Sequence, residues 1–483
     1  MSESLKPQLD FDKETMREMG YRTIDTIVDH LSNLHGKSAT ECKPWSDLDP
    51  SLREPPPKSP TDYQTVLDFT VKEILGPVMW CNHPRHYAWV PGPSNYVGAL
   101  ADTLSSGFNI AVDTWLEAAG PTQIEMTTIE WLRQWCGLPE GSSGIFVSGG
   151  SVANLTAIAT ARHIKLNDEI TDAVIYCSDQ LHSSVLRNLR ILGFRKDQIR
   201  KLPSDSGLRL SIPSLEDFYE ADVEAGKKPF CVIATAGTTN AGAVDPLPGI
   251  NRFCREHNLW FHIDGAYGAA AHLTEQGKNL LQGLGSADSI AIDPHKWLFQ
   301  PFEIGCCLVR EPNWLDITFS ERPEYLQDTW DDSDNRRQVN FGERGVQLTR
   351  GFRALKLWMT IKVFGETSLK AAIDHGINSA TYTESLLRNS GCFEIITPAQ
   401  LGIVTFRYIT KHHADPDQLT KAIYDANRKD GHSMLTTTLI QGNNVLRMCT
   451  INPRTTQEDL ETTVEKLMEL GQYADISLGK NGE

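Results

Sequence analysis

A lysine, an aspartate and a glycine-serine turn stand in an order that indicates one kind of chemistry. The turn Ser-Gly-Gly-Ser occupies 148–151, Asp264 ends the apolar run Phe-His-Ile-Asp, and Lys296 lies in the run Asp-Pro-His-Lys-Trp at 293–297. Such a turn binds phosphate through its backbone N–H groups, a buried carboxylate pairs with a protonated pyridine nitrogen, and a lysine amine forms a Schiff base with an aldehyde. Together the three elements predict a binding site for pyridoxal 5′-phosphate (PLP).

Each element also has a simpler interpretation. Lys296 alone could be a surface lysine, Asp264 could cap a helix, and glycine-serine turns are common in loops. Asp264 nevertheless ends an apolar stretch, where an unpaired carboxylate is unfavourable to bury, and a pyridine nitrogen would remove that penalty. The order of all three elements therefore favours the cofactor site.

Two further side chains follow apolar runs and could reach the cofactor. His182 comes shortly after the run 173–177, where a flat imidazole could stack on the ring and move protons. Thr239 ends the segment Thr-Ala-Gly-Thr-Thr at 235–239, and its hydroxyl could approach the ring. The alternatives are a structural histidine and ordinary turn chemistry. Only the surrounding pattern favours a functional role for either residue.

The bulk composition excludes several classes of protein. The 483 residues are 40% hydrophobic and 22% charged, which is ordinary for a soluble globular chain with more than one domain or subdomain. The formal net charge of −16 argues against nucleic acid and anionic membranes as partners. The first residues lack the apolar core of a signal peptide and no apolar run could span a bilayer, so we expect a cytoplasmic location.

The cysteines favour a reducing compartment. None of the ten cysteines forms a CxxC pair, so reduced thiols are expected and a disulfide framework is not. The neighbours Cys306 and Cys307 lie in an apolar run and are interpreted as core packing. No metal site is expected.

The first 60 residues predict a helix and a connector. Apolar residues recur at helical spacing over 11–35, and a proline-rich segment over 50–60 is predicted to be extended. A helix that leads into a proline connector has no local partner for its apolar face. We expect this face to pack on another subunit, with packing on its own chain as the alternative.

From about residue 90 to 360, short apolar runs alternate with helical patterns. Nearly continuous β-branched or aromatic runs are typical of strands buried on both faces of a largely parallel sheet. The runs lie at 144–147, 173–176, 231–235, 260–263 and 289–292. The polar stretch 310–345 predicts a mobile loop, a helix is predicted to resume at Val346, and a smaller α+β domain is expected over about 375–475.

Four motifs resemble the group II PLP-dependent amino acid decarboxylases. They lie at 179–184 (Asp-Gln-Leu-His-Ser-Ser), 262–267 (His-Ile-Asp-Gly-Ala-Tyr), 293–297 and 350–356 (Arg-Gly-Phe-Arg-Ala-Leu-Lys). The resemblance implies the α/β fold type I of PLP enzymes, with a large, mostly parallel seven-stranded sheet domain, a smaller C-terminal α+β domain and an N-terminal helical segment. The corresponding domains are 1–88, 89–374 and 375–483. It also implies an obligate homodimer with shared active sites, with the N-terminal helix packing across the dimer.

The resemblance also implies roles for individual residues. Lys296 would form the Schiff base and Asp264 would pair with the pyridine nitrogen. Ala266 and His182 would lie on opposite faces of the ring. The remaining expected contacts are to the phosphate, from Gly150, Ser151 and His295, and to the 3′-oxygen side, from Thr239.

Three departures from the family pattern concern the substrate and the product. Phe341 stands where aromatic decarboxylases carry a loop tyrosine that is thought to protonate the carbanion, and a phenyl ring donates no proton. His182, water or Tyr325 could supply that proton instead. Asp113 replaces an apolar pocket residue, and His86 with Tyr87 replaces two aromatic residues. These last two departures predict a somewhat polar substrate side chain or are neutral variation.

The favoured function is decarboxylation of an L-amino acid, with an aromatic one preferred, to its amine and carbon dioxide. In plant relatives a phenylalanine at the position of Phe341 accompanies oxidative deamination to an aldehyde, ammonia and hydrogen peroxide, which is the alternative. A non-catalytic scaffold would require loss of Lys296 or Asp264, and both are present. Aminotransferase chemistry usually needs an arginine for a second carboxylate, which spacing does not locate.

Overall fold

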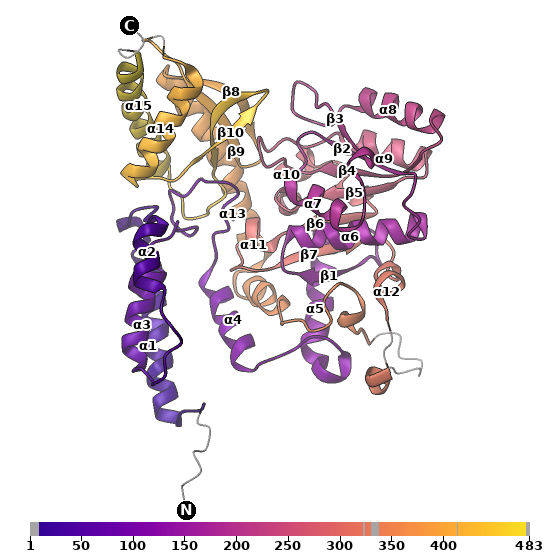
Figure 1. The fold of residues 1–483 in the computed structure, drawn as a ribbon, viewed down its shortest axis with the longest axis horizontal. Coiled ribbons are helices and arrows are strands. Elements are labelled where there is room, and N and C mark those ends of the chain that lie inside the picture. The colour runs from indigo at the N-terminus through magenta and orange to yellow at the C-terminus, as the bar shows by residue number, and fades with distance from the viewer. Residues whose placement is uncertain (1–8, 322–323, 330–337, 413, 480–483) are drawn as a thin grey trace, which may run out of the picture.

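Seven strands form the central sheet, in the order β1-β7-β6-β5-β4-β2-β3 (Figure 1). The computed structural model describes residues 9–321, 324–329, 338–412 and 414–479. The strands are β1 Ser143–Val147, β2 Ala173–Ser178, β3 Ile199–Leu202, β4 Lys228–Thr235, β5 Trp260–Asp264, β6 Ser289–Ile292 and β7 Gly305–Val309. All neighbouring pairs are parallel except those that β7 makes with β1 and β6. The predicted α/β fold with a mostly parallel seven-stranded sheet is confirmed.

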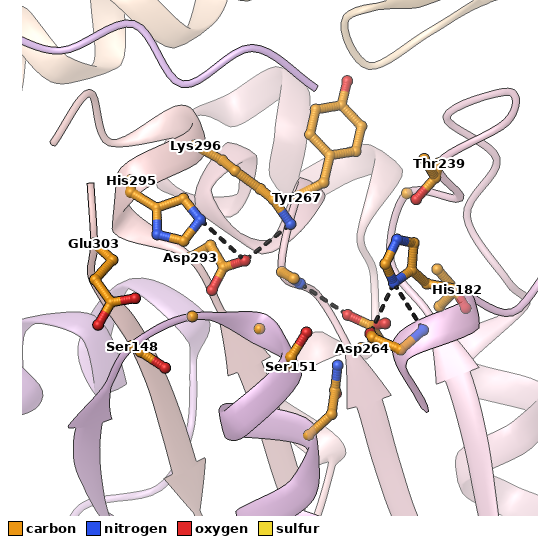
Figure 2. A pocket seen from close by; sticks show the side chains of 17 residues that line it. Ser148, Ser151, His182, Thr239, Asp264, Tyr267, Asp293, His295, Lys296 and Glu303 are labelled. Carbon is orange, nitrogen blue, oxygen red and sulfur yellow. Dashed lines mark hydrogen bonds and ion pairs between the residues drawn. The ribbon is translucent and has the colours of Figure 1, made fainter. Parts of the chain in front are cut away.

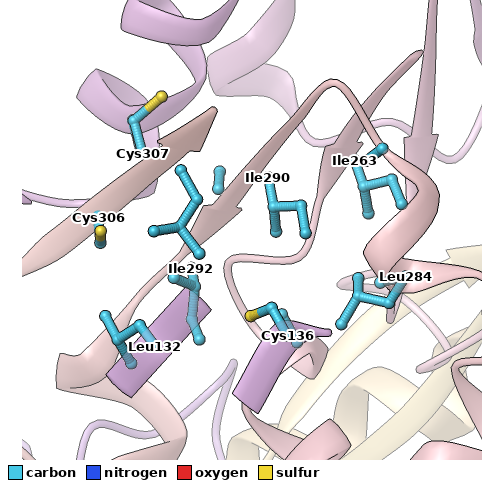
Figure 3. Close-up of a cluster of buried hydrophobic side chains, with 14 of the residues drawn as sticks. Leu132, Cys136, Ile263, Leu284, Ile290, Ile292, Cys306 and Cys307 are labelled. Carbon is cyan, nitrogen blue, oxygen red and sulfur yellow. The ribbon is translucent and has the colours of Figure 1, made fainter. Parts of the chain in front are cut away.

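The strands are buried because their residues are apolar on both faces. Every residue of β2, β5, β6 and β7 is buried, as the continuous apolar runs predicted. Figure 3 shows part of the core beside β5, β6 and β7, where Cys306 and Cys307 pack among isoleucine and leucine side chains. All ten cysteines are unpaired. The edge strand β3 was not predicted, because its four residues Ile-Arg-Lys-Leu include two cations and only Leu202 is buried.

Helices connect and cover the strands of this sheet. They are α4 Tyr96–Gly107, α5 Trp115–Cys136, α6 Gly150–Leu166, α7 Ser183–Ile191, α8 Ile212–Glu224, α9 Leu247–Glu256, α10 Glu275–Leu280, α11 Pro294–Trp297 and α12 Trp314–Phe319. α6 and α7 begin just beyond the carboxyl ends of β1 and β2, and α11 begins beyond β6. Several helix starts therefore meet at one edge of the sheet, where α/β proteins bind ligands.

The C-terminal part contains a second sheet, as predicted. Its antiparallel strands, in the order β10-β11-β9-β8, are β8 Phe393–Gln400, β9 Ile403–Tyr408, β10 Thr436–Ile440 and β11 Asn443–Cys449. The helices are α13 Ala354–Ser390, α14 Pro416–Asp430 and α15 Gln457–Gly479. α13 is kinked at Gly365, whose φ is +75°, and it crosses the position between 374 and 375 where a domain boundary was predicted.

The N-terminal arm, residues 9–75, extends away from the sheet domain (indigo in Figure 1). It contains α1 Lys13–Ser32, α2 Trp45–Leu52 and α3 Tyr63–Phe69, and none of the residues of α1 is buried. α1 begins where Asp12 accepts a hydrogen bond from Thr15 N, as an N-cap does. The prediction that the connector starts at 50 was wrong, because the exposed Pro50 lies inside α2.

Two predictions around the polar stretch 310–345 were also wrong in their bounds. α12 lies within this stretch, because Trp314, Leu315 and Phe319 pack on the large core. The helix predicted from Val346 begins only at Ala354. The acidic residues at 331–334 and the pair Arg336-Arg337, which motivated the loop, lie outside the described residues. No helix within the described ranges has the length and apolar content needed to cross a lipid bilayer.

Candidate active site

A cavity of about 300 Å³ lies at the carboxyl ends of β4, β5 and β6 (Figure 2). All eight residues that were predicted to contact the cofactor line it: Gly150, Ser151, His182, Thr239, Asp264, Ala266, His295 and Lys296. The other lining residues are Ser148, Gly149, Asn154, Ser184, Thr235, Gly237, Tyr267, Asp293 and Glu303. Residues far apart in the sequence meet here because their strands are neighbours in the sheet.

The turn before α6 brings bare backbone to the cavity wall. A Cβ atom on Gly150 would lie 2.7 Å from Asp293 Oδ2 and 2.9 Å from the Cβ of Ala266, and one on Gly149 would lie 3.0 Å from His295 Cε1. A side chain at either position would therefore crowd the neighbouring Asp293, Ala266 or His295. The N–H groups of Gly150 and Ser151, the first two of the 17-residue helix α6, have no acceptor among the described residues, and both residues line the cavity. The helix dipole adds to them, and together they can hold an anion such as phosphate.

Asp264 is the last residue of β5 and lies 5% exposed at the floor of the cavity. Its Oδ1 accepts a hydrogen bond from Ala266 N at 3.2 Å. Thr235 lies beside it on β4, and the Thr235 hydroxyl is buried without a hydrogen-bond partner among the described residues. A carboxylate and an unsatisfied hydroxyl at one end of a cavity suit a ligand that carries a protonated ring nitrogen.

Lys296 extends from the short helix α11 into the cavity. Its Nζ lies 2.8 Å from Asp293 Oδ2, and His295 Nε2 lies 3.6 Å from the same oxygen (Figure 2). Burial alone would lower the pKa of the Lys296 amine, but the Asp293 and Asp264 carboxylates outweigh burial and leave that pKa raised. His295 Nδ1 accepts a hydrogen bond from Ile304 N at 3.2 Å, so the neutral ring carries its proton on Nε2.

His182 is held in place as the N-cap of α7. Its Nδ1 accepts a hydrogen bond from Ser184 N at 3.3 Å and lies 2.7 Å from Ser184 Oγ. Burial lowers the pKa of His182 and outweighs the opposing effect of Asp264. The ring is therefore neutral at neutral pH, and its proton is on Nε2, the nitrogen that remains free to donate.

A hydrogen-bond chain supports the cavity floor from behind. Trp260 Nε1 donates to Ser289 Oγ at 2.8 Å, Ser289 Oγ lies 2.8 Å from His262 Nδ1, and His262 Nε2 lies 2.7 Å from Asn154 Oδ1. The indole can only donate, so the serine proton points to Nδ1 and the histidine proton points to Asn154. Burial lowers the pKa of His262 to about 4, which keeps this arrangement at neutral pH. The Asn154 amide is thereby oriented at the cavity.

Four predicted residues do not line the cavity of this chain. Phe341 is 1% exposed in the large core, with the Arg350 guanidinium 5.1 Å from its ring centre. Asp113 accepts a hydrogen bond from Arg350 N at 2.7 Å. His86 and Tyr87 follow the arm in the chain and are buried against the C-terminal part, and we call this segment the base of the arm. The Tyr325 side chain lies outside the described residues.

Sequence reasoning missed several residues of the cavity. Asp293 and Tyr267 lie inside motifs that were recognised for their neighbours, so a signal existed for both. Tyr267 stacks on Trp297 at 5.1 Å, and its hydroxyl accepts a hydrogen bond from Gly402 N, so it ties the cavity to the C-terminal part. Asn154 and Glu303 carry no comparable signal, because only the folded chain brings them to the cavity.

The chemistry of this cavity fits PLP. The glycine turn would hold the phosphate, Asp264 would meet the ring nitrogen, and Lys296 is the amine that can form the carbon–nitrogen double bond. The unsatisfied Thr235 hydroxyl offers a further hydrogen bond.

Comparisons with known proteins agree with this chemistry. Residues 47–409 match the pyridoxal-dependent decarboxylase conserved domain. An aromatic-L-amino-acid decarboxylase from Bacillus atrophaeus is 44% identical over 99% of both chains. A phenylacetaldehyde synthase from Arabidopsis thaliana is 28% identical over 97% of this chain and 98% of its own. The crystal structure of Catharanthus roseus tryptophan decarboxylase with L-tryptophan superposes with a TM-score of 0.89 and 27% identity over 98% of this chain and all of that one.

The domain match covers most of the chain, and the full-length relative shares more than two fifths of its residues. Fold, cavity and comparisons therefore lead to one conclusion: this chain belongs to the pyridoxal-dependent decarboxylase family and is a PLP-dependent carboxy-lyase that acts on an amino acid.

Proposed function

We propose that the enzyme decarboxylates an aromatic L-amino acid to the corresponding amine, with PLP bonded to Lys296. The observation that carries this proposal is the meeting of the lysine, the Asp264 carboxylate and the phosphate-binding turn in one cavity. The aromatic substrate is supported by the 44% identity, over 99% of both chains, to an aromatic-L-amino-acid decarboxylase.

The residues at the two ends of the cavity would fix the cofactor. Gly150 and Ser151 at the start of α6 would bind the phosphate, with His295 Nε2 as an additional donor. Asp264 would keep the ring nitrogen protonated, and Ala266 and His182 would lie on the two faces of the ring. Thr239 would lie on the 3′-oxygen side. PLP, when bound, supplies the electron sink that accepts the electron pair left by departing carbon dioxide.

The chain would control which bond breaks and where a proton returns. A substrate held with its carboxylate perpendicular to the ring loses carbon dioxide, so orientation decides the reaction. His182 can donate its Nε2 proton in a hydrogen bond to the substrate carboxylate, since Nδ1 is occupied by Ser184. After carbon dioxide leaves, Cα needs a proton, and the Lys296 ammonium is the cation of the cavity nearest to where PLP would be bonded.

The amine route is favoured over the aldehyde route. The aldehyde alternative rests on Phe341, which aligns with the loop tyrosine, and on similarity to a phenylacetaldehyde synthase. Phe341 is buried beneath Arg350, so its ring fills the core of its own chain. Its effect on the product would therefore be indirect.

We also propose a homodimer with shared active sites and a cytoplasmic location. Support for the dimer comes from the N-terminal arm, where Met16, Tyr21 and Val28 on α1 are 55%, 64% and 39% exposed. An apolar helix face of this kind is unfavourable in water and suits an interface between subunits. His86, Tyr87 and Asp113 remain predicted contributors to a substrate pocket that two chains would complete. No nucleic acid or membrane partner is proposed.

The test is an incubation of the PLP-loaded enzyme in air with L-tryptophan, L-tyrosine, L-phenylalanine, L-DOPA and L-histidine. Carbon dioxide, amine, aldehyde and peroxide are measured together. We expect one amine per carbon dioxide and no peroxide. Aldehyde with an equal amount of peroxide would contradict the amine route, and release of carbon dioxide only from L-histidine would contradict the aromatic substrate.

A further inference from the structure

Lys296 has a carboxylate counter-ion inside the cavity. Its Nζ lies 2.8 Å from Asp293 Oδ2, and the Asp293 side chain is 2% exposed. The second oxygen of Asp293, Oδ1, is buried and receives no hydrogen bond from the described residues. A buried carboxylate with so few donors is unfavourable unless a cation pairs with it. The lysine ammonium is therefore the group that stabilises Asp293.

The surroundings leave Asp293 as the main counter-ion of Lys296. Among the described residues, the other charged or titratable groups that face the pair are Asp264 from β5, Tyr267 just after β5, His182 from the start of α7, His295 from α11, and Glu303 with Lys356 beyond it. Burial lowers the pKa of both histidines, so neither brings a positive charge at neutral pH. Asp264 attracts the same ammonium but forms no hydrogen bond with it.

An ammonium at this position has a chemical consequence, because only a neutral amine attacks an aldehyde. We propose that Asp293 is a positioning residue that holds Lys296 as an ammonium whenever the lysine is not bonded to PLP. The inference rests on the assignment of Lys296 as the PLP-binding lysine. It adds a role for Asp293 in cofactor loading and in exchange of PLP between the lysine and the substrate.

Cofactor loading and exchange differ in the protonation state of Lys296 that they require. On loading, the ammonium first loses one proton, the amine attacks the aldehyde carbon, and the aldehyde oxygen leaves with two protons as water while the C=N bond forms. On exchange, the amino acid nitrogen replaces the lysine nitrogen in a protonated C=N bond. Two protons pass from the amino acid ammonium to the lysine nitrogen, which leaves as an ammonium beside Asp293. The carboxylate therefore slows loading at neutral pH and favours exchange.

The test compares the wild-type apoprotein with Asp293→Asn, which keeps the shape and removes the charge. PLP is added across neutral to alkaline pH, and the visible absorbance of lysine-bound PLP is followed. An opposite charge at this distance shifts a pKa by about one unit or more. We expect the pH of half-maximal loading rate to fall by about one unit and the rate at neutral pH to rise about tenfold. An unchanged pH profile would overturn the inference.

Glu303→Gln is the matched control, because it removes another carboxylate of the same cavity that does not contact Lys296. Its pH profile should equal that of the wild type, and an equal shift in both variants would overturn the specific role of Asp293. If Asp293→Asn does not fold, Asp293→Ala takes its place. A second readout uses tyramine added to the loaded protein, where Asp293→Asn should retain PLP on the lysine about tenfold more strongly.

Borohydride reduction separates failure of this inference from failure of the cofactor assignment. Reduction of the loaded wild type followed by peptide mass analysis should mark Lys296. A mark on another lysine would overturn the assignment itself. A mark on Lys296 together with a wild-type pH profile in Asp293→Asn would overturn only the role of Asp293.

Discussion

The floor of the cofactor cavity and the base of the N-terminal arm are both buried, but they differ in the hydrogen bonding of their polar side chains. At the cavity floor, His262 is hydrogen-bonded through both ring nitrogens, to Ser289 and to Asn154. At the base of the arm, His86 is equally buried, and neither of its nitrogens has a hydrogen-bond partner among the described residues. The comparison teaches that the histidine beneath the cavity is fully hydrogen-bonded within one chain, whereas the histidine at the base of the arm is not.

The arm repeats this contrast on its surface. The strands beneath the cavity are buried on both faces, while α1 buries no residue and leaves Met16 and Tyr21 more than half exposed. A region that is folded but leaves apolar groups in water and polar groups unpaired is arranged for an additional contact. We therefore expect changes at the cavity to affect chemistry, and changes at the arm to affect assembly and stability.

The largest expected effect is that of Lys296→Ala. Loss of the amine should reduce activity by roughly a thousandfold or more and abolish the visible absorbance of lysine-bound PLP. Lys165→Ala, which removes a half-buried lysine of α6 that contacts Asn258, is the control and should behave as the wild type. A borohydride-stable PLP adduct in Lys296→Ala would show that another lysine binds the cofactor.

Charges on the arm should break the proposed dimer. In a Met16→Glu/Val28→Glu variant, two exposed apolar side chains of α1 become carboxylates, and the dissociation constant should rise roughly a hundredfold. Light scattering across a dilution series measures this change. Ile191→Glu, an exposed apolar residue of α7, is the control. A monomeric wild type, or a variant as tightly associated as the wild type, would contradict the interface.

The two buried histidines should respond differently to substitution. Burial lowers the pKa of His86 to about 4, below the value of 6.5 for an exposed histidine. The unfolded chain therefore binds more protons between these values, and the free energy of unfolding should fall as pH is lowered from 6.5 toward 4. His86→Phe should remove up to about 3 kcal/mol of this loss, as measured by denaturant unfolding at several pH values.

His262→Phe is the matched control for the histidine comparison. It also removes a titrating imidazole whose pKa is about 4, but it breaks two hydrogen bonds. We expect it to destabilise the protein at every pH and to weaken PLP binding. Equal changes in the free energy of unfolding of the two variants at every pH would contradict this difference between the cavity floor and the base of the arm.

The smallest expected effect is that of Phe341→Tyr. The added hydroxyl would be buried in the core without a partner and should lower the free energy of unfolding by about 1–3 kcal/mol. The ratio of amine to aldehyde should not change, because the ring packs on Arg350 inside its own chain. Phe341→Leu, which removes the ring and adds no hydroxyl, is the control. A higher amine fraction in Phe341→Tyr would restore a direct role for this position in protonation.

The sequence predicted most strands of the sheet and part of the cavity lining for a physical reason. Strands buried on both faces are continuous apolar runs, and the polar residues at or just beyond their carboxyl ends, such as Asp264 and Thr239, meet at one edge of a parallel sheet. Asn154 and Glu303 were missed because their places depend on packing between distant segments. Phe341 could not be placed for the same reason: an alignment locates it in the chain but not in the core. The extended connector was predicted to start at Pro50, which was wrong because a proline does not end every short helix.

The long helix α13 has a consequence for how the molecule holds together. Its 37 residues pass from the large sheet to the second sheet, and Leu369, Ile373 and Ile377 share one apolar core with Ile403 and Ile451 beyond it. Two architectural layers that share a helix and a core should melt as one cooperative unit, with no stable fragment released by limited proteolysis. The C-terminal sheet is thus an integral wall of the enzyme and not a transplantable module.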